Sequence, residues 1–159
     1  MNPINAAVLG AGSRGVNYAN FALQAPEELN IVAVAEPRED RRAAFAEKFA
    51  VAPENCFGSW EALLAQPKLA DVVFVCTLDE DHLAPTLLAL EKGYHVLLEK
   101  PMSNREEECI AIEAAARKAG KILSVCHVLR YTAFYRTLKD LIDRGAVGEI
   151  TNITHIENV

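Results

Sequence analysis

The sequence predicts an α/β fold in which helices cover both faces of a doubly wound, mostly parallel sheet. Three observations support this prediction. Short apolar runs rich in β-branched residues alternate with segments whose apolar residues recur at helical spacing. The runs are apolar throughout rather than alternately apolar and polar, which indicates strands that are buried on both faces. A glycine-rich turn joins the first run to the first helical segment, as in nucleotide-binding folds of this class.

The elements follow from these patterns in chain order. The predicted strands are the apolar runs at residues 4–9, 31–35, 72–76, 95–98 and 122–127, with a short strand near 55–57. Five helices are predicted: residues 14–24, the segment with Phe45 and Phe49, the segment with Leu83, Leu87 and Leu90, the segment with Cys109, Ile112 and Ala116, and residues 133–144. In the last of these, Phe134, Leu138 and Leu141 are expected to be buried.

Short polar segments predict where two of these helices begin. Asp79 is expected to cap the helix that carries Leu83, because a side-chain oxygen there accepts from free N–H groups. Residues 103–106 read Ser-Asn-Arg-Glu, which predicts a capping box before the following helix.

The turn Gly10-Ala11-Gly12-Ser13-Arg14-Gly15 predicts a dinucleotide site of the Rossmann type. The first glycine permits a tight turn, the second lets the backbone approach a pyrophosphate, and the third lets the helix pack closely on the sheet. Ser13 and Arg14 stand at the helix start, where N–H groups attract anions. Arg14 suits either a phosphate contact or a solvated position.

Glu36 ends the next apolar run, 21 residues after Gly15, where an acid binds the hydroxyls of the adenosine ribose. A carboxylate there favours NAD over NADP. Arg38, Arg41 and Arg42 follow, and their guanidinium groups suit either the extra phosphate of NADP or the solvent face of the next helix. We expect the solvent face, so that NAD is the predicted cofactor and NADP the alternative.

The tripeptide Glu99-Lys100-Pro101 follows the strand at residues 95–98 and should therefore lie in the crevice at the carboxyl ends of the strands. Beside a bound nicotinamide, Lys100 is suited to exchange a proton with a substrate hydroxyl, and burial would favour its neutral form. The alternative is an ordinary surface lysine before a loop proline. Thr77 ends another strand and is suited to a backbone contact with the cofactor or to a purely structural place.

Several motifs together resemble the glucose–fructose oxidoreductase, inositol dehydrogenase and MocA-like oxidoreductases. The matching segments are the glycine turn with its strand, Ala35-Glu36-Pro37, residues 71–77 with His82, residues 93–101, His127-Val128-Leu129-Arg130-Tyr131, and residues 145–150. The resemblance covers essentially the whole chain.

The resemblance implies an N-terminal NAD(P)-binding Rossmann domain that is normally followed by a larger C-terminal α/β domain. It implies that Lys100 is the catalytic lysine and Glu99 its orienting partner, both bordering the cofactor. It places His82 near the cofactor, although a structural role is the stronger expectation there, and it places His127 and Arg130 near the substrate. A homo-oligomer is expected for the full-length form.

The last residues differ in pattern from the earlier strands. Residues 148–157 alternate between apolar and polar side chains, which predicts a half-exposed strand. We therefore expect a Rossmann domain at residues 1–147 and the start of a truncated second domain at residues 148–159.

Composition excludes several functional classes. The net charge of −6 disfavours nucleic acid, and no apolar run reaches the roughly 20 residues of a membrane span. The scattered cysteines, Cys56, Cys76, Cys109 and Cys126, predict neither a metal site nor a disulfide framework and fit a reducing cytoplasm.

Together these patterns predict the cofactor-binding part of a dehydrogenase. Its small-molecule substrate is expected to be a sugar or cyclitol whose hydroxyl or carbonyl exchanges a hydride with the nicotinamide. The chain alone is expected to bind cofactor but to turn over poorly. The alternative is a non-catalytic module that senses NAD(P) or mediates an interaction.

Overall fold

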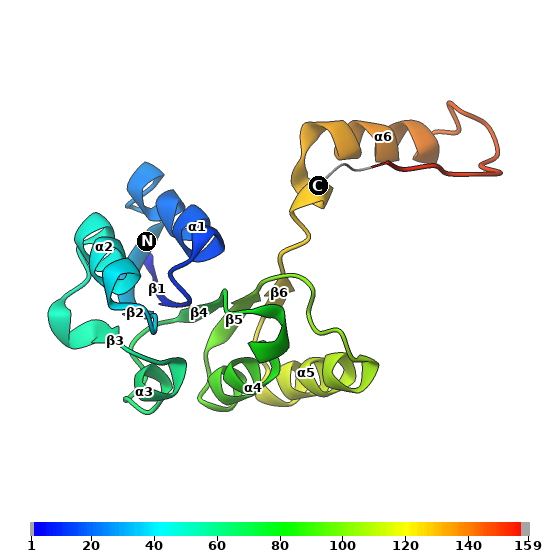
Figure 1. Cartoon of the computed structure of the whole chain (residues 1–159). Coiled ribbons are helices and arrows are strands. Elements are labelled where there is room, and N and C mark those ends of the chain that lie inside the picture. The colour runs from blue at the N-terminus through cyan, green and yellow to red at the C-terminus, as the bar shows by residue number, and fades with distance from the viewer. Residues whose placement is uncertain (1, 157–159) are drawn as a thin grey trace. The chain divides into compact units, whose positions relative to one another are not determined.

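A computed structural model of the chain describes residues 2–156 and divides them into two compact units. The first unit ends at Cys126 and the second begins at His127 (Figure 1).

The strands of the first unit are β1 (Ile4–Leu9), β2 (Leu29–Ala35), β3 (Cys56–Phe57), β4 (Val72–Val75), β5 (His95–Leu98) and β6 (Leu123–Val125). Its α-helices are α1 (Ser13–Gln24), α2 (Glu39–Phe49), α3 (Trp60–Leu64), α4 (Leu83–Glu91) and α5 (Glu106–Ala119). Short 3₁₀ turns, η1 (Pro53–Asn55) and η2 (Asp79–Asp81), lie between them.

The six strands form one sheet in the order β3-β2-β1-β4-β5-β6, and every neighbouring pair is parallel. The chain runs outward from β1 to β3, crosses back beside β1 with β4, and runs outward again to β6. This order is that of a Rossmann sheet, with its switch point between β1 and β4. The predicted fold class is confirmed.

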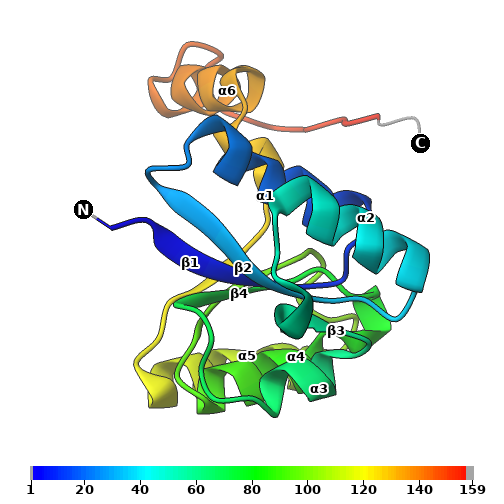
Figure 2. The ribbon, with the colours of Figure 1, turned by 90° about the vertical axis from the view of Figure 1, so that its left-hand side faces the viewer.

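Two apolar cores flank the sheet, and β1 supplies alternate residues to each. Ala6 and Val8 join one core, where α1 and α2 pack, whereas Ala7 and Leu9 join the other, under α3, α4 and α5. Figure 2 shows the two helical layers on opposite faces of the strands. Burial on both faces explains why the central strands β1, β2 and β4 are mainly apolar, with Asn5 and Asn30 near the strand starts.

Both predicted helix caps differ from the structure. Asp79 opens the 3₁₀ turn η2 rather than α4, whose first residue is Leu83. Ser103 does not cap α5, whose N-cap is Arg105; its hydroxyl instead accepts from the Arg105 N–H at 3.0 Å and donates to Glu108 at 2.7 Å. The helix therefore begins two residues later than the capping motif predicts, because the Ser103 hydroxyl bonds within the loop before α5.

The second unit consists of the 3₁₀ turn η3 (Val128–Tyr131), the helix α6 (Ala133–Asp143) and the segment after it. Thr132 caps α6 by accepting from the Tyr135 N–H at 3.5 Å. The later segment returns along α6, since the Tyr135 hydroxyl lies 3.3 Å from Nε2 of His155.

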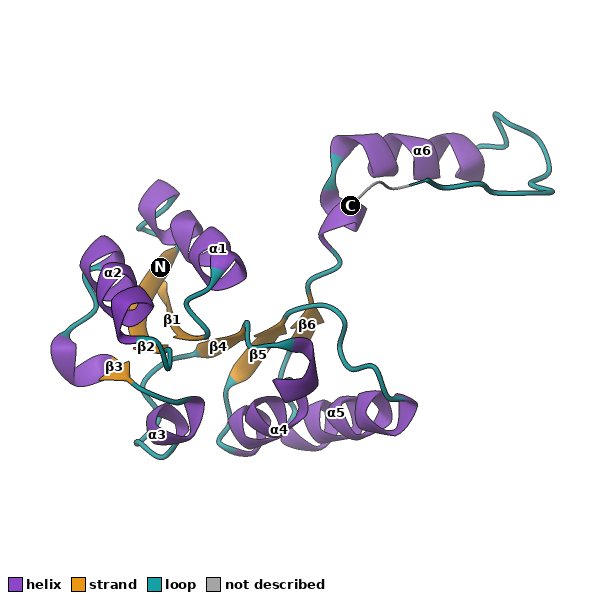
Figure 3. Cartoon of the chain, viewed as in Figure 1, coloured by secondary structure: helices purple, strands orange, loops and turns teal. Residues whose placement is uncertain are grey.

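Two expectations for this unit are wrong. The described residues from 148 to 156 form a loop rather than a strand (Figure 3), and residues 157–159 lie outside the described part of the chain. The predicted buried face of α6 is exposed: Phe134 is 70% accessible, Leu138 41% and Leu141 37%. An alternating or amphipathic pattern becomes a strand or a buried face only where a partner covers it, and the described residues supply none here.

Candidate functional site

The glycine turn is held in a conformation that requires glycine at two of its three positions. Gly10 has a positive φ of 95°, and a Cβ on it would lie 2.4 Å from the carbonyl oxygen of Cys76. A Cβ on Gly15 would lie 2.0 Å from the carbonyl oxygen of Gly10, so α1 packs directly on the turn. Both contacts fall far below the van der Waals limit, and any larger residue would displace the backbone.

Gly12 serves a different purpose, because the space above it is open. A Cβ built there would meet only Nη1 of Arg41, at 4.0 Å. Gly12 is also the N-cap of α1 and supplies no side-chain hydrogen bond to it. The N–H groups of the first turn, which includes Ser13, are therefore left for an anion that approaches over Gly12. This cradle fits the pyrophosphate of a dinucleotide.

Glu36 follows β2 directly and lies against the glycine turn. Its Oε2 accepts from the Ala11 N–H at 2.9 Å and its Oε1 accepts from the Arg38 N–H at 3.0 Å. These two bonds offset the cost of burying a carboxylate that is only 6% exposed. A carboxylate has further lone pairs, so Glu36 retains acceptor capacity for ribose hydroxyls.

The three arginines after Glu36 have different surroundings. The Arg38 guanidinium pairs with Asp40 at 2.7 Å, and Arg42 donates to the Glu36 carbonyl oxygen at 2.6 Å. Within residues 2–156, Arg41 makes no side-chain hydrogen bond or ion pair. Its guanidinium group, unlike those of Arg38 and Arg42, lies beside Gly12. Arg38 and Arg42 are thus engaged by neighbouring residues, and the choice between a phosphate contact and a solvent-facing role for these arginines stays a prediction.

Glu99 and Lys100 stand at the carboxyl end of β5. Oε2 of Glu99 accepts from the backbone N–H of Lys100 at 2.6 Å, and the carboxylate is only 5% exposed. Glu99 therefore holds the main chain of Lys100 and not its ammonium group. The Lys100 residue is exposed in this chain, so it lacks the burial that would favour a neutral amine.

Arg14 and Tyr18 reach the same carboxylate from α1. Nε of Arg14 lies 3.6 Å from Oε1 of Glu99, and the Tyr18 hydroxyl donates to that oxygen. Arg14 thus faces Glu99, a third arrangement beside the two weighed above. Sequence reasoning missed Tyr18, although its place three residues after Gly15 puts it on the same face of α1.

His82 and Thr77 occupy structural positions. His82 is only 1% exposed; its Nδ1 lies 2.8 Å from the carbonyl oxygen of Pro101 and its Nε2 lies 3.3 Å from that of Thr77. The Thr77 hydroxyl donates to the Asp81 carbonyl oxygen at 3.1 Å. These contacts favour the structural alternative for His82, which ties the loop after β4 to the loop after Lys100.

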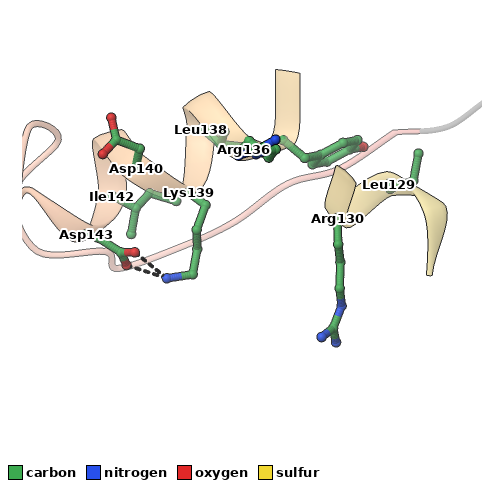
Figure 4. Close-up of a pocket in the computed structure, with 9 residues that line it drawn as sticks. Leu129, Arg130, Arg136, Leu138, Lys139, Asp140, Ile142 and Asp143 are labelled. Carbon is green, nitrogen blue, oxygen red and sulfur yellow. Dashed lines mark hydrogen bonds and ion pairs between the residues drawn. The ribbon is translucent and has the colours of Figure 1, made fainter. Parts of the chain in front are cut away.

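His127 and Arg130 belong to the second unit, and their contribution to the site stays a prediction. Arg130 lines a groove of about 780 Å³ along η3 and α6, none of whose lining residues comes from the glycine turn or from β5. In Figure 4 the ammonium group of Lys139 turns to Asp143, to which it donates at 2.6 Å, whereas Arg130 extends away from the ribbon. The groove is therefore formed by the second unit alone.

Two further properties bear on the class of protein. Among residues 2–156, no three His, Cys, Asp or Glu side chains gather in a set that could hold a metal ion. No helix in the same range combines the length and the apolar character that crossing a bilayer requires.

Comparison with known proteins agrees with this geometry. Residues 4–127 match the family GFO_IDH_MocA, described as an oxidoreductase family with an NAD-binding Rossmann fold. The chain belongs to this family. The resemblance drawn from the motifs and the prediction of an NAD-binding domain are both confirmed.

Relatives in the GFO_IDH_MocA family are considerably longer than this chain. D-glucoside 3-dehydrogenase of Escherichia coli is 32% identical over 149 residues, which are 94% of this chain and 42% of that enzyme. 1,5-Anhydro-D-fructose reductase of Ensifer adhaerens is 36% identical over 122 residues, which are 74% of this chain and 34% of the reductase. The chain thus spans less than half the length of these relatives.

A solved structure shows the same architecture. The WlbA dehydrogenase of Bordetella pertussis, in complex with NADH and UDP-GlcNAcA, is similar with a TM-score of 0.84 at 25% sequence identity. The similarity covers 93% of this chain and 42% of that one.

The electrostatics of this GFO_IDH_MocA domain favour neutral donors around Glu99. Burial raises the pKa of Tyr18 well above its usual range, and its hydrogen bond to Glu99 raises it further. Burial likewise raises the pKa of the Cys76 and Cys126 thiols. The phenol therefore remains a hydrogen-bond donor, and the two thiols remain protonated, at neutral pH.

Proposed function

We propose that this chain is the cofactor-binding part of an NAD-dependent oxidoreductase that acts on a hydroxyl or carbonyl group of a sugar or cyclitol. The observation that carries the proposal is the position of Lys100. It follows β5 at the same edge of the sheet as the glycine turn and Glu36, with its backbone held by Glu99 and its ammonium group free in solvent. A domain that only sensed a nucleotide would need no ionisable group at that place.

Residues from both halves of the sheet take part in binding the cofactor. The first turn of α1 presents N–H groups to the pyrophosphate above Gly12, and Glu36 accepts from hydroxyls of the adenosine ribose. Glu99, at the end of β5, stands on the side of the switch point where the other half of a dinucleotide binds. Lys100 is therefore placed beside the nicotinamide half.

Lys100 is the proposed acid and base. In the oxidative direction its neutral Nζ takes the proton of the substrate hydroxyl while the carbinol carbon gives up its hydride; in the reductive direction the ammonium returns that proton to the oxygen. When bound, NAD supplies the acceptor of the hydride. Neutral Nζ requires the side chain to leave water, and in this chain alone Lys100 is exposed.

The substrate class is supported by the relatives. A glucoside dehydrogenase and an anhydrofructose reductase share 32% and 36% of the aligned residues, and both names describe carbohydrate substrates. Because the chain matches 42% of the glucoside dehydrogenase, we infer that the residues selecting a particular sugar correspond to the part of such enzymes that this chain does not match. The isolated chain is then expected to bind cofactor and to turn over poorly.

Cofactor titration tests the proposal. Adding the purified chain to NADH should enhance the nicotinamide fluorescence in a saturable way, and NADPH should bind more weakly because Glu36 faces its 2′-phosphate. Lys100→Met should leave NADH binding within about twofold and should abolish any slow oxidation of polyols. Absence of NADH binding would refute the proposal, and equal turnover by Lys100→Met would refute the role of Lys100.

A further inference from the structure

A single buried carboxylate connects the cofactor helix to the reaction lysine. Glu99 is 5% exposed, and both of its oxygens are engaged: Oε2 by the Lys100 N–H at 2.6 Å and Oε1 by the Tyr18 hydroxyl. Arg14 adds a longer contact to Oε1 at 3.6 Å, from a side chain that is half exposed. The Tyr18 hydroxyl is thus the main donor that fixes the free end of this carboxylate.

Tyr18 belongs to α1, the helix whose first turn carries the anion cradle. It stands one turn after Gly15, the residue at which α1 packs against the glycine turn. A hydrogen bond from Tyr18 to Glu99 therefore spans from the β1–α1 half of the sheet to the end of β5, across the switch point. The two side-chain hydrogen bonds of Glu36 make no such crossing, because their donors lie in the loops after β1 and β2.

The place of Glu99 in the sheet determines which part of a dinucleotide this network serves. The sheet order puts β2 and Glu36 on one side of the switch point and β5 and Glu99 on the other. In a fold of two mononucleotide-binding halves, the adenosine half lies on the side of Glu36 and the nicotinamide half on the side of Glu99.

We propose that Tyr18 is a positioning residue for the nicotinamide half of the site. Its hydroxyl fixes the orientation of the Glu99 carboxylate by a hydrogen bond. Glu99 in turn holds the Lys100 backbone where the nicotinamide and the substrate meet. The inference rests on the proposed function. It adds that the placement of Lys100 depends on a side chain of α1 and not on the loop after β5 alone.

The phenol is well suited to this task. At neutral pH the Tyr18 phenol is protonated and donates to Glu99, whereas the buried Glu99 carboxylate needs a donor. In Tyr18→Phe the ring still fills its space, but Oε1 keeps only the 3.6 Å contact with the half-exposed Arg14. Glu99 is then free to turn toward solvent, and the Lys100 N–H loses its fixed partner.

The experiment compares two ligands that differ only in the nicotinamide. NADH and ADP-ribose are titrated by calorimetry into the wild-type chain, Tyr18→Phe and Tyr94→Phe. Tyr94 is the matched control, because its buried hydroxyl accepts from the Leu69 N–H at 3.0 Å in the core away from the site. Loss of a hydrogen bond to a charged group should weaken NADH binding by Tyr18→Phe about tenfold. ADP-ribose binding should change less than about twofold, and Tyr94→Phe should bind both ligands as the wild type does.

The outcomes separate the inference from the proposed function. If the wild-type chain binds neither ligand, the proposed function fails. If it binds both and Tyr18→Phe binds NADH as tightly as the wild type, only the role of Tyr18 is refuted. An equal loss for NADH and ADP-ribose in Tyr18→Phe would also refute it, because general damage to α1 affects both ligands alike.

Discussion

Each glycine of the dinucleotide turn answers a different physical demand. Gly15 is required by the fold, since a Cβ there would lie 2.0 Å from the Gly10 carbonyl oxygen and 3.1 Å from Cγ1 of Val8. Gly12 has open space around it and ordinary negative φ, so the folded chain would accept a larger residue. Only an approaching pyrophosphate gives a reason for glycine at that position.

Substituting these two glycines should separate folding from binding. Gly15→Ala should destabilise the chain by about 3 kcal/mol or more, because backbone atoms must move apart. Gly12→Ala should change the free energy of unfolding by less than about 1 kcal/mol and weaken NADH binding at least about tenfold. Urea denaturation and NADH titration measure the two effects, with Gly58→Ala as a control because its Cβ would meet no atom within 4 Å. Normal NADH binding by Gly12→Ala would contradict the assignment of the cradle.

Tyr18 also links stability to alkaline pH. An unfolded tyrosine ionises near pH 10, whereas burial and the bond to Glu99 raise the pKa of Tyr18 in the folded chain. The stability that the neutral phenol contributes is therefore complete below about pH 10 and is lost as pH rises toward the folded pKa. Glu99 and Cys126 are the titratable groups that influence Tyr18.

Tyr18→Phe should remove this alkaline loss. The difference in free energy of unfolding between the wild type and Tyr18→Phe should stay constant below about pH 10 and shrink above it. Urea denaturation followed by Trp60 fluorescence at several pH values measures the difference, since the indole packs against the core. A difference that does not change up to about pH 11 would show that Tyr18 ionises in the folded chain as it does in water.

At the scale of elements, α5 and α6 both carry apolar residues at helical spacing but have different surroundings. Ile112 of α5 is fully buried in the core beneath α4, whereas Leu138 of α6 is 41% exposed. Periodicity marks the apolar face of a helix in both cases. It does not say whether a partner covers that face.

Truncating one side chain on each helix should reveal the difference. Ile112→Ala should lower the free energy of unfolding by about 2–5 kcal/mol, because it leaves a cavity in a closed core. Leu138→Ala should cost less than about 0.5 kcal/mol, as expected for an exposed position. The denaturation midpoints of both variants, compared with that of the wild type, measure these losses of stability. A comparable loss in Leu138→Ala would mean that the face of α6 is covered in solution.

The errors of sequence reasoning at this scale share one cause. The strands and all helices except α3 were predictable, because β1 to β6 are mainly apolar and the helical periods of the longer helices are clear. The five-residue helix α3 (Trp60–Leu64) is too short to show such a period. The starts of α4 and α5 were not predictable, because Asp79 and Ser103 bond within loops that precede the helices. A local sequence pattern shows which side chains could cap a helix, and tertiary contacts determine which of those hydrogen bonds form.

At the scale of the whole molecule, the described residues 2–156 separate into a six-stranded sheet with its helices and a second unit that contains α6. Within this range every strand and both apolar cores lie before His127. Apolar side chains of α6, such as Phe134, are exposed and belong to neither core. The first unit therefore has what an independent folding unit needs.

A chain shortened to residues 1–126 should fold and bind cofactor. We expect its urea midpoint and its NADH affinity to agree with those of the whole chain within about twofold, because the glycine turn, Glu36 and Glu99 are all retained. Circular dichroism and calorimetry measure both properties. Loss of the folding transition in the shorter chain would show that residues after Cys126 are part of the core.

The candidate site was only partly predictable at this scale. The glycine turn, Glu36 and Lys100 follow recognisable spacings, because phosphates and ribose impose fixed distances on the chain. Tyr18 could not be found by spacing to Glu99, from which it is 81 residues distant in sequence. Such a contact arises only when the two halves of the sheet come together.

The two buried glutamates hold equivalent places in those halves. Glu36 follows the second strand of the first half and Glu99 the second strand of the other, and each accepts from backbone N–H groups of nearby loops. In the proposed function, one carboxylate faces the adenosine end of the cradle and the other the reacting end. On that proposal, substitutions after β2 would change the cofactor preference without disturbing the chemistry at β5, so long as the bond from Tyr18 is kept.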